Sequence, residues 1–258
     1  MILNNKKALI IGVASKRSIA ASIADSFSRN GAEIALTYQN DKLKSRVEDI
    51  AENLETKENV LLHPCDLSND QDIISLKSYI KDKWGSIDII IHSAAFAPRE
   101  LLSGDFVDNI TRDGFQIAHD LSSYSFTALA KEFRDIINID GSMITLSYLG
   151  SERVIKNYNV MGLAKASLES NVRYMSQSLG PDNIRVNAVS AGPIKTLAAA
   201  GISGFNEILK HVEDKSALKR NITLEEVANT ALFLASTQSS GITGQVIYVD
   251  GGFNISGV

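Results

Sequence analysis

Seven short runs of apolar, often β-branched residues recur along the chain, and helical patterns occupy most of the intervals between them. The runs cover residues 7–13, 32–38, 59–66, 87–92, 141–147, 183–190 and 244–250. Continuous apolar runs of this length are typical of strands that are buried on both faces of a parallel sheet. Because no Pro/Gly/Ser-rich linker divides the chain, we predict one domain over residues 1–258. Its expected architecture is α/β, with a doubly wound, seven-stranded parallel sheet flanked by about six helices.

The bulk composition narrows the classes of function. The 258 residues are 44% hydrophobic, which suffices for a large core, and a net charge of −4 without a basic cluster argues against a nucleic-acid partner. The single cysteine, Cys65, excludes an internal disulfide, and the four histidines show no metal-ligand spacing. No apolar segment is long enough for a signal core or a membrane span. We therefore expect a soluble, cytoplasmic protein without a metal site.

The first run ends in a glycine and leads through a polar loop into a helical pattern, the layout of a dinucleotide-binding turn of the Rossmann type. Its glycine motif is incomplete, since Gly12 is present but Ser18 and Ala20 stand where further glycines are common. Both replacements are physically suitable, because Ser18 can hydrogen-bond a phosphate and Ala20 allows close helix packing. We therefore predict that a pyrophosphate lies at the start of this helix.

The ends of the next two strands carry candidate contacts for adenosine. Gln39 can hydrogen-bond a ribose hydroxyl, and no arginine stands at this strand end to bind a 2′-phosphate. This pattern favours NADH over NADPH, although Lys42 and Lys44 leave the choice open. Asp66 is a candidate acceptor for the adenine amino group. A plain turn residue at position 39 and a helix cap at position 66 are the alternative interpretations.

Later segments are expected at the same edge of the sheet. Small residues follow the fourth strand in the segment 93–98, where a nicotinamide ribose could lie against the backbone, and Tyr148 follows the fifth strand. Residues 111–138 have the pattern of one long helix that serves the core and a subunit contact. The segment at about 194–210 suits a mobile lid over an apolar ligand, because small residues dominate its middle, 198–201.

Tyr158 and Lys165 are the most informative pair of side chains. We expect both on one helix that starts near residue 157, where seven steps of roughly 100° bring the chain back to nearly the same face. The residues between them are mostly small, which would let a flat ligand approach. By itself the pair also fits an ordinary helix with a surface tyrosine and lysine.

Taken in chain order, these motifs resemble the divergent short-chain dehydrogenase/reductases, and more closely the bacterial NADH-dependent enoyl-[acyl-carrier-protein] reductases. The resemblance covers nearly the whole chain, and its specific segments are residues 12–20, 37–44, 92–98, 118–120, 158–165 and 187–196. The Tyr-x6-Lys spacing is the discriminating one. Ordinary short-chain dehydrogenases have Tyr-x3-Lys, and Gly162 stands where that spacing requires lysine.

The resemblance implies a role for each matching residue. Contacts to the cofactor NADH are implied for Gly12, Ser18, Ile19, Gln39, Asp66, Leu67, Ala94, Lys165, Ile194, Lys195, Thr196, Leu197 and Ala198. Contacts to the acyl substrate are implied for Ala97, Tyr148, Tyr158, Met161 and Phe205. The implied catalytic residues are Tyr158, Lys165 and Tyr148. The resemblance also implies an acyl carrier protein as the partner that bears the substrate, and a homotetramer.

Two places depart from the commonest family pattern. Ala95 stands where glycine is frequent, and its methyl group narrows the space beside the nicotinamide. Just after the expected lid, relatives can carry basic residues, but this chain has Ser203, Asn206 and Glu207. The remaining candidates for attracting an acidic carrier are Lys210, Lys215, Lys219 and Arg220. A solvated helix face is an equally good interpretation of these cations.

The implied reaction sends a hydride to the β-carbon of a trans-2-enoyl thioester, so that negative charge develops on the thioester oxygen. A neutral phenol is a good hydrogen-bond donor to that oxygen, which makes Tyr158 the expected donor. Lys165 is expected to hold the ribose, and Tyr148 to shape the pocket or join proton delivery. A 3-oxoacyl (carbonyl) reductase of the same superfamily and a non-catalytic dinucleotide-binding sensor remain the alternative functions.

Overall fold

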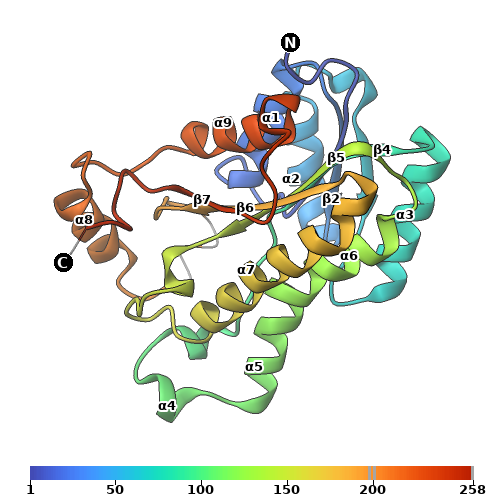
Figure 1. Ribbon diagram of the computed structural model, residues 1–258. Coiled ribbons are helices and arrows are strands. Elements are labelled where there is room, and N and C mark those ends of the chain that lie inside the picture. Colours follow the sequence, from blue (N-terminus) through green and yellow to red (C-terminus); the bar gives the residue numbers. More distant parts are fainter. Residues whose placement is uncertain (197–198, 200–201, 257–258) are drawn as a thin grey trace.

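The computed structural model describes residues 1–196, 199 and 202–256, and within them one sheet contains seven parallel strands (Figure 1). The strands are β1 (Lys7–Ile11), β2 (Glu33–Tyr38), β3 (Leu61–Pro64), β4 (Ile87–His92), β5 (Ile137–Ser147), β6 (Arg185–Ala191) and β7 (Val246–Val249). Their spatial order is β3-β2-β1-β4-β5-β6-β7. The predicted doubly wound parallel sheet is confirmed, and its strand order reverses between β1 and β4.

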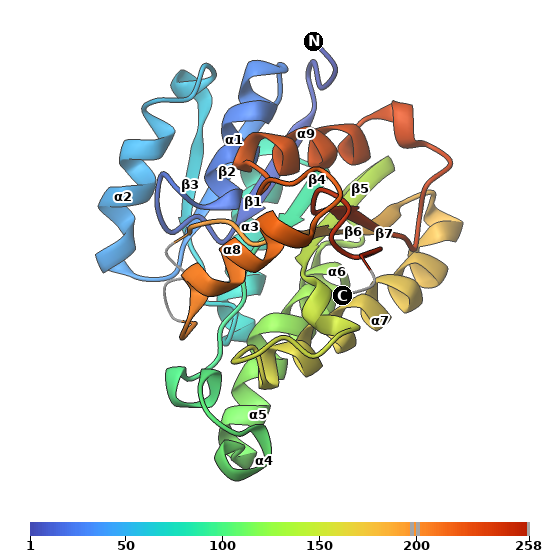
Figure 2. The same cartoon turned by 90° about the vertical axis from the view of Figure 1, so that its left-hand side faces the viewer.

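Helices cover both faces of this sheet. They are α1 (Ile19–Arg29), α2 (Asp41–Ala51), α3 (Asp70–Trp84), α4 (Phe106–Asn109), α5 (Arg112–His119), α6 (Ser125–Phe133), α7 (Val160–Leu179), α8 (Phe205–Lys215) and α9 (Leu224–Ala235). Helices α1, α2 and α9 pack on one face, and α3, α6 and α7 on the other (Figures 1 and 2). The described helices outnumber the six expected because α4, α5 and α8 add to the connections after β4 and β6. None of these helices is both long and apolar enough to cross a membrane.

The central strands contribute alternate residues to two separate cores, which explains their continuous apolar runs. In β1, Ala8 and Ile10 enter the core beneath α1 and α9, whereas Leu9 and Ile11 enter the core beneath α3, α6 and α7. Side chains of a strand alternate between the two faces of a sheet, so burial of both faces requires an apolar residue at every position.

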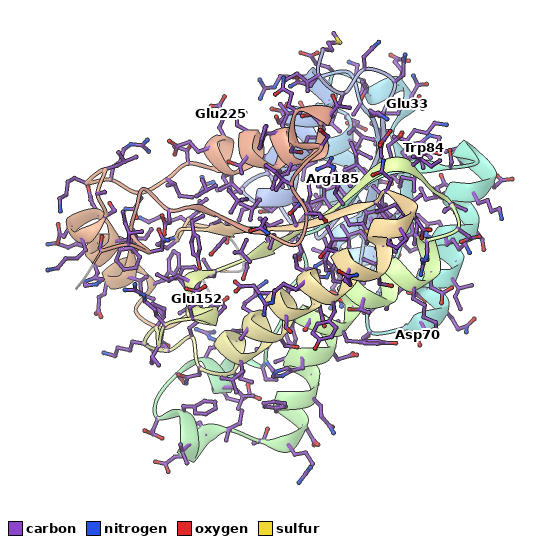
Figure 3. All side chains as sticks on the ribbon, viewed as in Figure 1. Glu33, Asp70, Trp84, Glu152, Arg185 and Glu225 are labelled. Carbon is purple, nitrogen blue, oxygen red and sulfur yellow. The ribbon has the colours of Figure 1, made fainter. Side chains whose placement is uncertain are left out.

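One buried cation ties β6 to α9. This cation is Arg185, which is labelled in Figure 3 and is only 8% exposed. It donates hydrogen bonds to the carbonyl oxygens of Leu234, at 2.7 Å, and Ser236, at 3.2 Å. It also donates to Ser239 Oγ at 2.8 Å. These carbonyls belong to the carboxyl end of α9, where unpaired acceptors and the helix dipole favour a positive charge.

The expected long helix over residues 111–138 is wrong at its carboxyl end. Helical backbone runs from Arg112 to Phe133 and contains a π-helical turn, Asp120–Tyr124. Strand β5 already begins at Ile137, which pairs with Ile87 of β4. Pairing with the neighbouring strand therefore overrides the helical pattern of the last residues.

Candidate active site

The carboxyl ends of β1 and β4 approach so closely that position 12 requires glycine. Gly12 has a φ of +98°, and a Cβ there would lie 2.3 Å from the carbonyl oxygen of Ser93 and 3.0 Å from the amide nitrogen of Ala94. The Gly12 turn and the Ser93–Ala94 loop therefore form adjoining backbone walls. They lie where the strand order reverses, which is the usual place for a nucleotide in an open parallel sheet.

The start of α1 beside this turn has the geometry of an anion site. The hydroxyl of Ser18, which we expected to bind a phosphate, caps the helix in this structure. Ser18 is the N-cap residue, and its Oγ accepts a hydrogen bond from Ala21 N at 3.1 Å. The same hydroxyl donates to Ser15 O at 2.8 Å, so its proton is already engaged. The donors available to a phosphate are then the backbone N–H groups of the first helical turn, which begins at Ile19.

The ends of β2 and β3 are joined by a side-chain hydrogen bond. Gln39 Nε2 donates to Asp66 Oδ2 at 3.2 Å, and Asp66 Oδ1 accepts from the backbone N and the hydroxyl of Ser68. These hydrogen bonds outweigh desolvation and lower the pKa of Asp66 below its ordinary value. Leu67 is buried next to them. Two residues assigned to the adenosine thus form one polar pair at the edge of the sheet.

A largely apolar cavity of about 500 Å³ opens at the carboxyl ends of β5 and β6. It is lined by Ile19, Ala95, Phe96, Ala97, Arg99, Leu102, Ser147, Tyr148, Tyr158, Met161, Ala191, Gly192, Pro193, Ile194, Thr196, Ala199, Ile202 and Phe205. All five residues that the sequence assigned to the acyl substrate lie in this lining. Three of the assigned cofactor residues, Ile19, Ile194 and Thr196, lie there too.

Two tyrosines stand next to each other in this cavity. The rings of Tyr148 and Tyr158 meet edge to face, with centroids 4.9 Å apart and an interplanar angle of 76°. Burial raises the pKa of Tyr148 to about 12 and raises that of Tyr158 further, so both phenols are neutral at pH 7. The Tyr148 hydroxyl is buried and forms no hydrogen bond with any residue that the structure describes. It is therefore a donor in need of a partner.

The prediction that Tyr158 lies on the helix with Lys165 is wrong. Tyr158 belongs to a turn that precedes α7, and its N–H donates to Ile155 O at 3.0 Å. The neighbouring asparagines, Asn157 and Asn159, have positive φ values of 64° and 40°, which a helix does not permit. Asparagine tolerates this region better than most residues, so the chain can turn sharply here. The helical spacing argument therefore does not apply to Tyr158 and Lys165, because α7 begins only at Val160.

Lys165 lies on α7 with only 6% exposure, and its Nζ donates to Leu146 O of β5 at 2.6 Å. Lys165 is not among the residues that line the cavity. Its ammonium group has two further N–H groups that a ligand could use. Burial lowers its pKa to about 8, and the nearby carboxylate of Glu169 opposes that change. Lys165 is thus a cation at pH 7 and loses its proton as the pH rises through about 8.

A buried histidine that sequence reasoning did not single out supports the loop after β4. His92 is fully buried between Thr145 Oγ1, 2.9 Å from Nδ1, and Ser125 Oγ, 2.8 Å from Nε2. Each hydroxyl also has a backbone acceptor, since Ser125 Oγ donates to Leu121 O at 2.8 Å and Thr145 Oγ1 donates to His92 O at 3.2 Å. Desolvation, with a contribution from Lys165, lowers the pKa of His92 to about 3. The ring is therefore neutral and locks β4 to β5 and α6.

Several lining residues also escaped the sequence interpretation. Phe96 was recoverable from its place after β4, and Ile202 lies within the segment predicted as a lid, whereas Leu102 comes from the turn Arg99–Leu102, which has no local signal. Lys195 lines a neighbouring cleft between Pro193 and α8 instead of the cavity. Two assigned cofactor residues, Leu197 and Ala198, lie outside the described residues.

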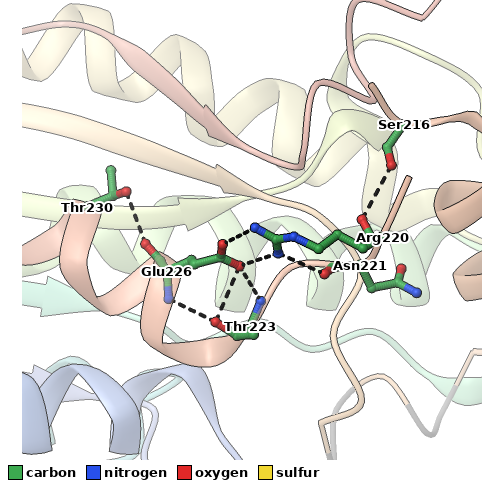
Figure 4. Close-up of polar contacts among 6 residues, drawn as sticks. All are labelled: Ser216, Arg220, Asn221, Thr223, Glu226 and Thr230. Carbon is green, nitrogen blue, oxygen red and sulfur yellow. Dashed lines mark hydrogen bonds and ion pairs between the residues drawn. The ribbon is translucent and has the colours of Figure 1, made fainter. Parts of the chain in front are cut away.

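One of the proposed docking cations is already engaged. Arg220 holds the carboxylate of Glu226 with two hydrogen bonds, of 2.6 Å and 3.1 Å, and Glu226 also accepts from Thr223 N at 2.8 Å (Figure 4). Thr223 caps α9 and forms a capping box with Glu226. The hydrogen bonds from Arg220 and Thr223 lower the pKa of Glu226 to about 2. Arg220 is thus part of the helix cap, which favours the structural interpretation of this residue.

The doubly wound sheet with a glycine turn at its switch point defines a nucleotide-binding fold of the Rossmann type, and the family profile places the chain among the short-chain dehydrogenase/reductases. The protein-family profile described as "Enoyl-(Acyl carrier protein) reductase" matches residues 12–254. The curated enoyl-[acyl-carrier-protein] reductase [NADH] of Salmonella typhimurium is 52% identical over 254 residues, covering 98% of this chain and 96% of that protein. The chain belongs to the enoyl-[acyl-carrier-protein] reductase family.

Solved structures agree with this assignment. The Bacillus cereus enoyl-acyl carrier protein reductase with NADP+ and indole naphthyridinone has a TM-score of 0.97 and 46% identity, covering 100% of this chain and 99% of that chain. The reductase of Anaplasma phagocytophilum in complex with NAD has a TM-score of 0.95 and 41% identity, covering 100% of this chain and 97% of that chain.

Proposed function

We propose that this protein reduces the trans-2 double bond of enoyl-[acyl-carrier-protein] thioesters with NADH, as a step of type II fatty acid elongation. The observation that carries the proposal is the pairing of two neutral tyrosines in a largely apolar cavity of about 500 Å³. An acyl chain requires an apolar cavity, and the developing enolate requires a hydrogen-bond donor in a site shielded from water.

The residues present fit a nicotinamide dinucleotide. The close approach at Gly12 allows a flat ligand to lie against the backbone, and the start of α1 suits a pyrophosphate. Gln39 and Asp66 suit the adenosine, and Ala94 suits the nicotinamide side of the groove. We assign Ile194, Lys195 and Thr196 to the segment that closes over the bound nucleotide. When bound, NADH supplies the hydride.

The chain's own groups then serve the substrate. Tyr158 donates a hydrogen bond to the thioester oxygen, where negative charge develops. The Tyr148 hydroxyl, which has no partner among the described residues, is a second donor beside it. Both phenols keep their protons at neutral pH because burial raises each pKa. Lys165 holds the ribose hydroxyls with its free N–H groups. Met161, Phe205 and Ala97 border the acyl chain.

The polar pair at the end of β2 supports NADH over NADPH. The Asp66 carboxylate next to Gln39 would repel a 2′-phosphate, while Gln39 Oε1 is left to accept from a 2′-hydroxyl. The relative in Salmonella typhimurium is named for NADH, and solved relatives hold NAD in one case and NADP+ in another. Measuring the rate with each cofactor under identical conditions tests the preference.

The substrate partner, the assembly and the location are further proposals that rest on the same assignment. We propose that an acyl carrier protein presents the substrate near the segment 194–210, which acts as the lid. We also propose that the protein is a cytoplasmic homotetramer. Sedimentation or light scattering tests the tetramer, and a dimer or monomer that retains full activity would contradict it.

The candidate functions are separated by following the loss of NADH absorbance with crotonyl, longer trans-2-enoyl and 3-oxoacyl thioesters. Oxidation with trans-2-enoyl thioesters but not with 3-oxoacyl thioesters supports the proposal, whereas the reverse pattern supports the carbonyl reductase. NADH binding without oxidation of either thioester supports the non-catalytic sensor. Crotonyl and longer enoyl thioesters are both needed, because a short chain can leave the cavity partly filled.

A further inference from the structure

Glu169 is a buried carboxylate that the mechanism above does not use. It is 5% exposed on α7 and stands four residues after Lys165, so the two side chains share one face of the helix. Acidic residues are almost never buried to this extent unless a partner holds them. The partners of Glu169 therefore indicate its role.

Two serines on either side of Tyr148 hold this carboxylate. Glu169 Oε1 accepts hydrogen bonds from Ser147 Oγ and, at 2.7 Å, from Ser151 Oγ. Ser147 is the last residue of β5, and Ser151 is the last residue of the following 3₁₀ turn, η4 (Leu149–Ser151). The carboxylate therefore fixes both ends of the short segment that carries Tyr148.

The same segment positions Tyr158. Gly150 packs so closely on the Tyr158 ring that a Cβ at position 150 would lie 2.4 Å from its Cδ1 atom. Gly162 of α7 packs on the backbone of Gly150 in turn, since a Cβ at position 162 would lie 2.6 Å from the carbonyl oxygen of Gly150. A shift of η4 would therefore displace both tyrosines relative to the cavity.

Lys165 and Glu169 dock α7 onto consecutive residues of β5. Lys165 binds Leu146 O and Glu169 binds Ser147 Oγ. Burial lowers the pKa of Lys165, and the negative charge of Glu169 acts in the opposite direction by favouring the charged ammonium. The other titratable groups around this pair are the neutral His92 of β4 and the phenols of Tyr148, Tyr158 and Tyr248. The carboxylates of Glu152 and Asp250 lie near Tyr248 of β7.

We propose that Glu169 is a positioning residue of the active site, which holds Tyr148 in place through Ser147 and Ser151 and sets a carboxylate one helical turn from the Lys165 ammonium on the same face of α7. The proposal rests on the proposed function for the roles of Tyr148 and Lys165. It predicts two separable effects, one on geometry and one on charge.

Glu169→Gln tests the charge, because the amide oxygen can still accept from both serines. NADH binding is measured by fluorescence titration from about pH 6 to about pH 9, a range that lies on both sides of the lowered Lys165 pKa of about 8. We expect the alkaline loss of affinity to move to lower pH, with roughly threefold or greater weakening near pH 8 and little change near pH 6. A profile that coincides with that of the wild type would overturn the charge effect.

The double variant Ser147→Ala/Ser151→Ala tests the geometry and leaves the carboxylate in place, so it stays informative if Glu169→Gln does not fold. We expect kcat to fall while the pH profile of NADH binding keeps its position. A wild-type kcat would overturn the positioning effect. Since NADH titration needs no acyl substrate, a protein that shows the predicted profile but reduces no enoyl thioester would contradict the proposed function and not the link between Glu169 and Lys165.

Discussion

Tyr148 and Tyr158 meet edge to face in the cavity, with ring centroids 4.9 Å apart, although one follows a strand and the other precedes a helix. If Tyr158 is the donor to the thioester oxygen, Tyr158→Phe keeps this ring contact and removes only the hydroxyl. We expect turnover to fall about a hundred- to a thousandfold, as for other single donors to a developing oxyanion.

Thermal unfolding of the Tyr158→Phe variant should match that of the wild type within a few degrees. Tyr248→Phe is the control, because it removes another buried phenol hydroxyl and Tyr248 does not line the cavity. Equal turnover by the Tyr158 variant and the wild type would reject Tyr158 as the donor.

The close packing of Gly150 on the Tyr158 ring makes a second prediction. In Gly150→Ala the added methyl group would lie 2.4 Å from Tyr158 Cδ1, so the ring must move. Because small displacements of a catalytic group are costly, we expect kcat/KM for the enoyl thioester to fall roughly tenfold to a hundredfold. In the control Gly180→Ala, the methyl group meets no atom within 4 Å, and activity should be retained. Equal activity of both variants would show that the ring position is unimportant.

The buried ammonium of Lys165 predicts how NADH binding depends on pH. Because its pKa is lowered to about 8, the folded protein holds the cation below that pH and releases its proton above it. Affinity for NADH should therefore decline as the pH rises through about 8. Tyr148 and Tyr158 stay protonated there and do not contribute to the decline.

The same titration with Lys165→Met should give weaker binding at neutral pH and no decline near pH 8. Methionine keeps an unbranched side chain of similar length and carries no charge. A decline that persists in this variant would assign the titration to another group.

His92 predicts a loss of stability in acid. Its pKa is about 3 in the folded protein, against an ordinary value of 6.5, so the unfolded chain binds more protons between these limits. The stabilisation is therefore complete above pH 6.5 and is lost as the pH falls toward 3, at a slope of at most about 1.4 kcal/mol per pH unit.

Urea unfolding of wild type and His92→Gln at several pH values measures this slope. The variant should be less stable at pH 7, because the hydrogen bonds to Thr145 and Ser125 change, but it should lose less stability on acidification. The carboxylates common to both proteins cancel in the comparison. Parallel slopes would mean that His92 does not titrate as its burial requires.

The sheet could be predicted from the sequence because burial on both faces leaves a local record in every strand. Ala8 to Ile11 are all apolar for that reason, and Gly12 records the close approach to Ser93. The pair of Tyr158 and Lys165 stands out from the residues themselves and receives its roles from the resemblance, but the helical argument for the alignment of the two side chains is wrong. The turn at Asn157 and Asn159 depends on backbone conformations that the sequence only permits.

The cavity was only partly predictable, because part of its wall comes from a turn with no local signal. Leu102 reaches the cavity from that turn, whereas Ile202 lies in the segment predicted as a lid. The link from Glu169 through Ser147 and Ser151 spans a helix, a strand and a turn, so it exists only once α7 has docked on β5. By contrast, the boundary error at residues 134–138 arose because strand pairing overrode a local helical pattern.

The most direct test follows the hydride itself. The protein is incubated with a trans-2-enoyl-[acyl-carrier-protein] and NADH deuterated at both C4 positions, and the acyl product is examined by mass spectrometry. Our account predicts a saturated acyl chain with one deuterium on the β-carbon. An unreduced double bond, or a saturated acyl chain without deuterium on the β-carbon, would contradict it.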